Sequence, residues 1–162
     1  MSRIRLASMA AICTLLVTMP GVSQTPMPSP RPKATAPRLV PVAETRLIME
    51  GINQPNFQGL EKLLQNKELD AEGWKFARGQ ALLIAESGNL LMMRPPRSSG
   101  QEAWMKAGTE LRDAASNFAR TLATRDLQRS RAGLTQLANA CNKCHQSFNI
   151  QTRISAFAPA MP

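Results

Sequence analysis

The sequence predicts an all-α protein in which residues 42–155 fold as an antiparallel, up-down-up-down four-helix bundle. Four stretches of roughly 20 to 25 residues repeat apolar residues at spacings of three and four, the period of an amphipathic helix. No stretch alternates cleanly between apolar and polar residues, as a half-buried strand would, and the chain has no tyrosine. Short connections make neighbouring helices antiparallel.

The first 23 of the 162 residues are expected to be a secretory signal sequence. Arg3 and Arg5 precede an apolar run that ends at small residues, which is the layout of such a signal. A membrane anchor is the alternative, but Pro20 and Gly21 end the run before the roughly 20 apolar residues that a spanning helix needs. We therefore expect a periplasmic protein without a membrane span in the mature chain.

The chain is basic, with a formal charge of +9 at pH 7, and removal of the signal sequence takes away Arg3 and Arg5. This balance favours acidic protein partners or anionic surfaces. Nucleic acid is not expected as a partner, because the chain is exported and does not interleave aromatic with basic residues.

Two segments outside the bundle are expected to be flexible. Residues 24–41 contain six prolines and three basic residues, so they cannot form a helix or a central strand, and we expect a disordered tether there. At the other end, residues 156–162 are expected to form a flexible tail.

The first two helical stretches are expected at about residues 42–65 and 71–93. Pro55 predicts a kink in the first, and Asp70 is a candidate N-cap of the second. The inner faces are expected to carry Val42, Met49, Ile52, Leu60 and Leu64 in the first stretch, and Trp74, Ala77, Ala81, Ile84, Gly88 and Leu91 in the second. The small residues of the second face either let helices pack closely or leave room for something large between them.

The third stretch is expected to begin near Gln101, where Ser99 and Glu102 fit a capping box, and the fourth after residue 126, with Thr121 or Thr124 as its cap. Their inner faces are expected to carry Trp104, Gly108, Leu111, Ala115, Phe118 and Leu122 in the third, and Leu127, Leu134, Leu137, Cys141, Cys144, His145 and Phe148 in the fourth.

The fourth stretch contains the segment "CNKCH", in which Cys141 and Cys144 are the only cysteines beyond residue 13 and His145 is the only histidine of the chain. On a helix these positions, i, i+3 and i+4, share one face. The pattern Cys-x-x-Cys-His is typical of c-type haem attachment. Each thiol can add to a haem vinyl group to form a thioether, and the imidazole can bind the iron as proximal axial ligand. The motif therefore predicts one covalently attached haem c.

Three other interpretations of the motif remain open. Structural zinc normally takes four nitrogen or sulfur ligands, whereas the mature chain offers two cysteines and one histidine. A thioredoxin-like redox pair requires a βαβ context, which this helical pattern lacks. A disulfide between Cys141 and Cys144 leaves His145 without a role, although it would fit a bundle that has no cofactor.

A haem motif in the last helix of a helical chain resembles the class II cytochromes c, the cytochrome c-prime family, over about residues 42–150. The segment "ETRLIMEGI" is similar to the family's first helix, and "GNLL" in the second stretch is similar to an exported branch of it. The resemblance implies a bundle whose C-terminal helix holds the haem, with Arg46 near a propionate, Phe148 packed near the ring, and dimerisation through the first two helices. Asn149 departs from the basic residue that the family often has, and Arg153 is the nearest substitute.

The expected function depends on the sixth position of the iron. Because His145 is the only histidine, the family comparison leaves Met49 as the candidate distal ligand, with Met92 and Met93 as weaker ones. Met/His ligation favours a low-spin electron carrier. If Met49 only packs in the core, the iron is five-coordinate and the resemblance implies binding of NO or CO.

We therefore expect an exported monohaem cytochrome that exchanges electrons with redox partner proteins, and alternatively a cytochrome c-prime-like binder of NO or CO. An enzyme is not expected, since the sequence has no second histidine, no glycine-rich phosphate loop and no paired carboxylate pattern.

Overall fold

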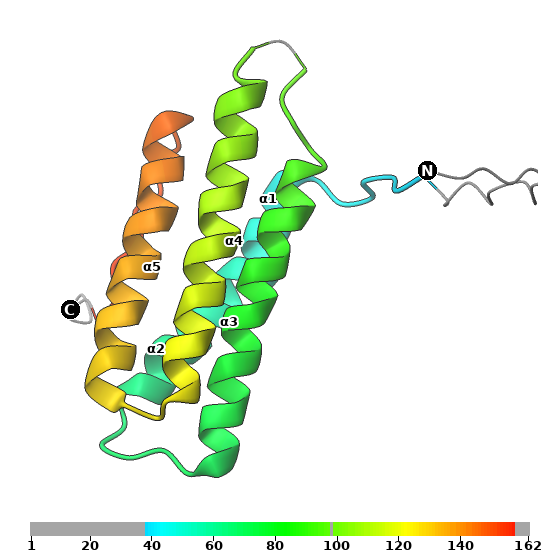
Figure 1. Ribbon diagram of the computed structural model, residues 1–162. Helices are drawn as coiled ribbons and strands as arrows, with labels where there is room; N and C mark the ends of the chain where they lie inside the picture. The colour runs from blue at the N-terminus through cyan, green and yellow to red at the C-terminus, as the bar shows by residue number, and fades with distance from the viewer. Residues whose placement is uncertain (1–37, 98, 158–162) are drawn as a thin grey trace, which may run out of the picture. The chain divides into compact units, whose positions relative to one another are not determined.

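The computed structural model describes residues 38–97 and 99–157, and this part of the chain is all-helical, without β-strands (Figure 1). The expected signal sequence, residues 24–37 of the expected tether and residues 158–162 of the expected tail lie outside the described residues. Helices pack against one another throughout the described part, which confirms the all-α prediction. Among these residues, no helix combines the length and the apolar character needed to cross a membrane.

The helices form four long stretches. The first is continuous through three elements, α1, a π-helical turn η1, and α2, and a single helix makes up each of the others. The bounds are α1 Thr45–Ile48, η1 Met49–Asn53, α2 Gln54–Gln65, α3 Ala71–Met92, α4 Gln101–Ala123 and α5 Leu127–Ser147.

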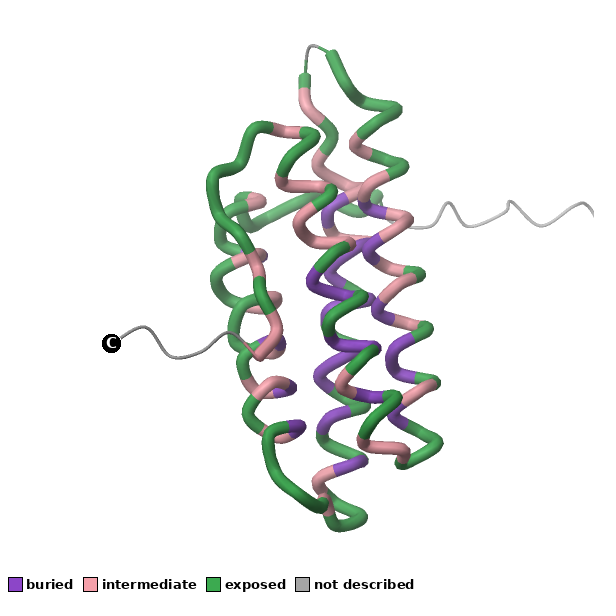
Figure 2. The backbone as a smooth tube through the Cα atoms, turned by 90° about the vertical axis from the view of Figure 1, so that its left-hand side faces the viewer, coloured by how far each residue is buried: buried purple, intermediate pink, exposed green. Residues whose placement is uncertain are grey.

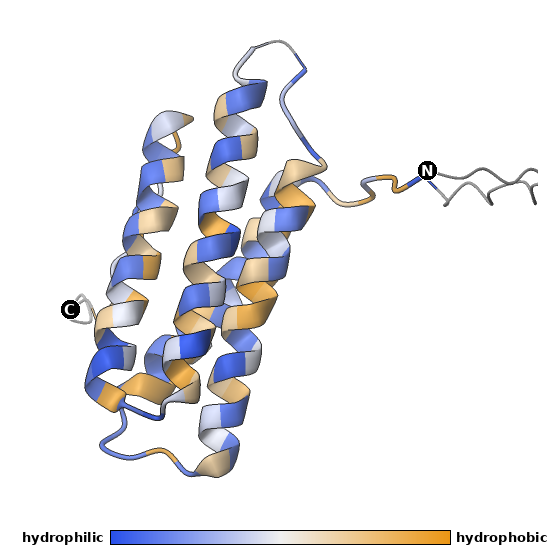
Figure 3. Ribbon diagram, in the orientation of Figure 1, coloured by the Kyte–Doolittle hydropathy of each residue, from blue (hydrophilic) through white to orange (hydrophobic). Residues whose placement is uncertain are grey.

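One face of each of the helices α2 to α5 is buried, and the outer faces are mostly polar, although α3 also exposes apolar side chains (Figures 2 and 3). The predicted inner face of α3 is confirmed, because all six of its residues are buried. On α4 and α5 the middle of each predicted face is buried, whereas Trp104, Leu127 and the haem-motif residues are half-buried. The fully enclosed side chains of the core are Leu60, Leu64, Ile84, Leu122, Leu134 and Leu137, together with Ser87 and Ser130.

The predicted inner face of the first stretch is partly wrong. Val42 is 96% exposed and precedes the helix, whereas Ile48 and Phe57 belong to the core. Val42 is exposed because the helix begins only at Thr45. The burial of Ile48 follows from the π-helical turn, in which the Gln54 N–H donates to the Met49 carbonyl five residues back. The wider turn shifts the face that the helix presents, which a period of 3.6 residues does not anticipate. It lies directly before Pro55, where the sequence predicts a kink.

Two of the three predicted caps are wrong. Asp70 does cap α3, accepting a hydrogen bond from the Gly73 N–H at 2.7 Å. At α4 the N-cap is Gly100, whose φ of 82° favours glycine, so Ser99 does not cap the helix. At α5 the Asp126 carboxylate accepts from the Arg129 N–H at 2.9 Å, in place of Thr121 or Thr124.

Helices α3 and α4 make the closest backbone contact, where two glycines face each other. A Cβ atom on Gly88 would lie 2.7 Å from the Gly108 carbonyl oxygen and 2.9 Å from the Arg112 nitrogen, both of which are backbone atoms. Nearby, the indole N–H of Trp104 donates to the Leu91 carbonyl at 2.6 Å. The small residues of α3 therefore serve close packing at this crossing.

We expect Gly88→Ala to lower the free energy of unfolding by about 1–3 kcal/mol, because the new methyl group forces two backbones apart. Gly79→Ala on the same helix is the matched control. No atom lies within 4 Å of a Cβ atom built there, so alanine is expected to stabilise the helix by about 0.5–1 kcal/mol. Urea denaturation measures both changes. A Gly88 variant as stable as the Gly79 variant would contradict the close contact.

Candidate functional site

The three motif side chains lie on the last two turns of α5. Asp126 begins this helix and no irregularity interrupts it before Ser147, so the spacing of Cys141, Cys144 and His145 is helical as predicted. All three side chains are half-buried. Cys141 also packs against the main core cluster, so the motif lies where the core meets the surface.

Both cysteines are free thiols, and their surroundings favour the neutral form. Burial, and then the neighbouring Cys144, raises the pKa of the Cys141 thiol to about 12. Burial, followed by the charge of Glu110, also raises the pKa of Cys144. Because the thiolate is the nucleophile, both thiols are poorly reactive once the helices have packed.

The imidazole of His145 is already held on one side. Its Nδ1 lies 2.8 Å from the backbone carbonyl oxygen of Thr152. A carbonyl only accepts, so this bond requires the proton on Nδ1, and in the neutral imidazole the lone pair of Nε2 is then available. Histidines that bind metals commonly have this arrangement, in which a hydrogen bond from the other ring nitrogen fixes tautomer and orientation.

A tight reversal at the end of α5 brings Thr152 back to His145. The Ile150 N–H donates to the His145 carbonyl at 2.8 Å and the Asn149 N–H to the Gln146 carbonyl at 3.3 Å, the two bonds of a Schellman motif. Asn149 has a φ of 57°, a left-handed conformation that asparagine adopts more readily than most residues. Asn149 therefore ends the helix, and Arg153, the expected substitute for a basic residue there, is exposed.

The chain after this reversal runs back beside α5 (Figure 2). The Asn142 side chain donates to the Ile154 carbonyl at 2.7 Å and accepts from the Ile154 N–H at 2.8 Å. The Phe157 N–H donates to the Glu61 carboxylate of α2. Ile154, Ala156 and Phe157 pack against the core, so the described part of the expected flexible tail is docked.

Met49, the candidate distal ligand, lies at the start of η1 and also packs against the core cluster. Its sulfur accepts a hydrogen bond of 3.1 Å from the Asn53 amide, whose oxygen accepts one of 2.6 Å from the hydroxyl of Ser87. Ser87 is fully buried. Neither Asn53 nor Ser87 is predicted from the sequence, although polar residues among the apolar positions of the first two stretches could have indicated them.

Among the described residues, α1 and η1, which carry Arg46 and Met49, make no direct contact with α5. Element η1 packs on α1, α2 and α3, whereas α5 packs on α4 and α2. Arg46, the predicted propionate partner, has an 81% exposed side chain whose Nε lies 2.6 Å from the Glu50 carboxylate. This pairing raises the pKa of Arg46, first through the hydrogen bond and then through the charge of Glu50.

Two contacts tie the motif end of α5 to α4. The Phe148 ring packs edge-on against Trp104, with ring centroids 5.1 Å apart. The Lys143 ammonium lies 2.8 Å from the Glu110 carboxylate, and this hydrogen bond lowers the pKa of Glu110. Phe148, predicted to pack near a haem ring, thus has an aromatic partner within the protein.

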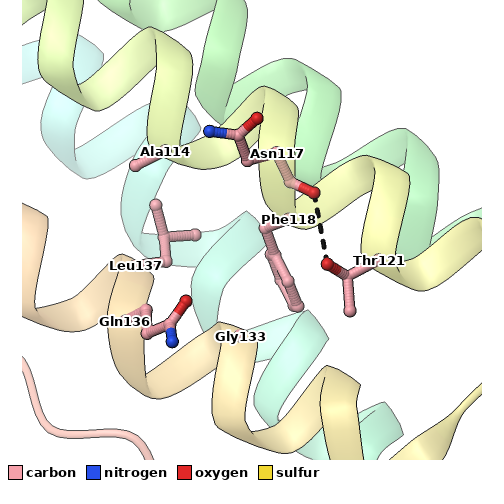
Figure 4. A pocket seen from close by; sticks show the side chains of 7 residues that line it. All are labelled: Ala114, Asn117, Phe118, Thr121, Gly133, Gln136 and Leu137. Carbon is pink, nitrogen blue, oxygen red and sulfur yellow. Dashed lines mark hydrogen bonds between the residues drawn. The ribbon is translucent and has the colours of Figure 1, made fainter.

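A cavity of about 240 Å³ lies between α4 and α5, one turn before Cys141 (Figure 4). It is smaller than the roughly 300–1,000 Å³ of typical ligand pockets. Gly133 leaves room there for the ring of Phe118, which would lie 2.7 Å from a Cβ atom at that position. The cavity lining consists of Ala114, Asn117, Phe118, Thr121, Gly133, Gln136 and Leu137.

Two thiols and one imidazole on the same helix are the groups that a haem c uses. Within residues 38–97 and 99–157, no three His, Cys, Asp or Glu side chains are arranged to hold a metal ion together. A haem c does not require such convergence, because its thiols bond to carbon and only the imidazole of His145 would bind iron. Free thiols at Cys141 and Cys144 and a free Nε2 at His145 meet these needs.

Comparisons with protein-family models, curated proteins and solved structures find no match for this chain.

In the haem-free polypeptide beginning at residue 24, we expect iodoacetamide to alkylate Cys141 more slowly than Cys144. At pH 8 a thiol with a pKa of about 12 carries far less thiolate than one with the ordinary value of 9.0. Unfolding in urea should therefore accelerate alkylation of Cys141 on the order of a hundredfold or more. Mass spectrometry of Cys144→Ser and Cys141→Ser variants measures each thiol separately. Equal rates in folded and unfolded protein would contradict the burial of Cys141.

Proposed function

We propose that this chain is an exported monohaem c-type cytochrome that transfers electrons. The single observation that carries the proposal is the face of α5 on which two free thiols accompany an imidazole whose Nδ1 is engaged by the Thr152 carbonyl. If Cys141 and Cys144 only formed a disulfide with each other, the orientation of the His145 imidazole would have no function. The Cys-x-x-Cys-His pattern and its place in the last helix, which resemble those of class II cytochromes c, are consistent with the same function.

In this proposal the four helical stretches form an antiparallel, up-down-up-down bundle whose last helix carries the haem. Cys141 and Cys144 would hold the group through thioethers, and Nε2 of His145 would bind its iron. The haem, when bound, supplies a one-electron couple between ferric and ferrous iron. The protein's own part is to fix the imidazole, through Thr152, and to limit the access of water by packing Trp104 against Phe148.

Met49 is the proposed distal ligand, since a thioether together with the imidazole of His145 would favour an electron carrier with a raised potential. Its sulfur accepts a hydrogen bond from Asn53 and keeps a second lone pair. The alternative, binding of NO or CO at a five-coordinate iron, is favoured by the same bond, because Asn53 and Ser87 hold Met49 within the first two stretches.

The proposed partners are redox proteins with acidic surfaces, given the basic charge of the chain. The proposed homodimer would use the first two stretches. Phe76, Leu82 and Leu83 expose apolar side chains there on the outer face of α3, between 40% and 62% accessible. Exposed apolar patches of this kind are typical of protein contacts.

We expect protein matured in a host that attaches haem to show a Soret band and a mass increase of one haem that survives denaturation. Cys141→Ser and Cys144→Ser should each leave one thioether, and the double variant should lose the haem on denaturation, because no covalent link remains. Absorption spectroscopy and intact-mass spectrometry measure these changes. A colourless protein with the mass of its bare polypeptide would overturn the proposal.

Met49→Ala is expected to convert a low-spin iron into a high-spin one, to lower the reduction potential, and to let the ferrous protein bind CO. Met105→Ala is the matched control, because Met105 is 42% exposed on α4. Absorption spectra of the reduced protein with and without CO measure the change. If the wild-type protein already binds CO and is high-spin, the gas-binding alternative replaces electron transfer.

A further inference from the structure

We propose that Asn142, an unassigned residue inside the Cys-x-x-Cys-His motif, is a positioning residue. Through the segment of residues 149–157, it controls how strongly the imidazole of His145 donates electrons to the iron. The inference rests on the proposed function, because it concerns an imidazole that binds iron. It assigns to residues 149–157 a role that no part of the motif itself indicates.

Asn142 holds Ile154 through two hydrogen bonds, which together are called the clamp below. The Asn142 amide donates to the Ile154 carbonyl at 2.7 Å and accepts from the Ile154 N–H at 2.8 Å. One side chain thus satisfies both backbone groups of a residue 12 positions later, as a neighbouring strand would. Asn142 can do this because it lies next to Cys141 on α5 and is itself half-buried.

The clamp also fixes the short chain segment that contacts His145. Only Gln151 to Arg153 separate the Schellman turn at Asn149 and Ile150 from the clamped Ile154. Both ends of this short segment are therefore fixed, and the Thr152 carbonyl between them lies 2.8 Å from Nδ1 of His145. Thr152 is exposed, so without the clamp water would compete for the imidazole.

The clamp has a consequence for the iron. A hydrogen bond from Nδ1–H to a carbonyl makes the imidazole a stronger electron donor at Nε2. A stronger donor stabilises ferric iron more than ferrous iron, which lowers the reduction potential. The clamp therefore lowers the reduction potential although Asn142 does not bind the iron, and loss of the clamp raises the potential.

The test compares Asn142→Ala with Asn139→Ala in the haem-loaded protein. Asn139 is an exposed residue of the same helix, so its replacement controls for the helix propensity of alanine. We expect Asn142→Ala to shift the reduction potential upward and to speed solvent exchange of the Nδ1 proton of His145, measured by NMR. The Ile154 amide should exchange about tenfold faster, because its acceptor is gone. Asn139→Ala should leave all three values unchanged.

Two further variants keep the inference testable if Asn142→Ala fails to fold. Asn142→Asp keeps an acceptor for the Ile154 N–H and loses the donor, so the Ile154 amide and the Nδ1 proton of His145 should exchange at rates between those of the wild type and those of Asn142→Ala. A chain that ends at Gln151 lacks the Thr152 carbonyl and should shift the potential at least as far as Asn142→Ala.

The outcomes separate the two proposals. Wild-type protein that carries no covalent haem overturns the proposed function. Haem-loaded variants whose potential and Nδ1 proton exchange match those of the wild type overturn the role of Asn142 and leave the cytochrome proposal standing. A faster Ile154 amide with an unchanged potential also overturns that role, since the clamp would then be structural only.

Discussion

The backbone contact of α3 with α4 at Gly88 and Gly108 is the constraint on which the rest of the structure depends. Because these two helices meet so closely, the Trp104 indole reaches a carbonyl on α3, and its ring then packs against Phe148 at the end of α5. The Cys-x-x-Cys-His motif is therefore positioned by the contacts of α3 with α4 and of α4 with the end of α5. A larger residue at either glycine would alter the distance between the helices that carry the candidate site.

The end of α5 combines several requirements in one short stretch. The same two turns provide the thiols, the imidazole and the clamp residue Asn142, and the reversal that follows supplies the carbonyl for His145. Helix geometry alone places Cys141, Cys144 and His145 on one face. The orientation of the imidazole, in contrast, depends on a chain segment that lies beyond the helix and is held by hydrogen bonds to it.

Local patterns predicted the helices well because amphipathic periodicity reports directly which side of a helix is buried. The predicted face of α3 is buried in full, whereas that of the first stretch failed at Val42 and omitted Ile48. Val42 precedes the first helix, which begins at Thr45, and the π-helical turn before Pro55 changes the register between Ile48 and the rest of the stretch. No pattern of apolar residues encodes such a turn. The capping box predicted at Ser99 is also wrong, because the N-cap of α4 is Gly100, which has a left-handed backbone conformation.

By itself, the sequence determined the class of fold, the four helical stretches and the grouping of two thiols with one imidazole, because each follows from spacing along a single helix. Only the tertiary structure decided how those groups are supported. The bonds between Asn142 and Ile154, from His145 to Thr152 and from the Ser87 hydroxyl to Asn53 depend on how the chain turns after a helix or where two helices meet. Periodicity carries no information on such contacts, since a polar side chain on a half-buried face has many partners within reach and packing selects one.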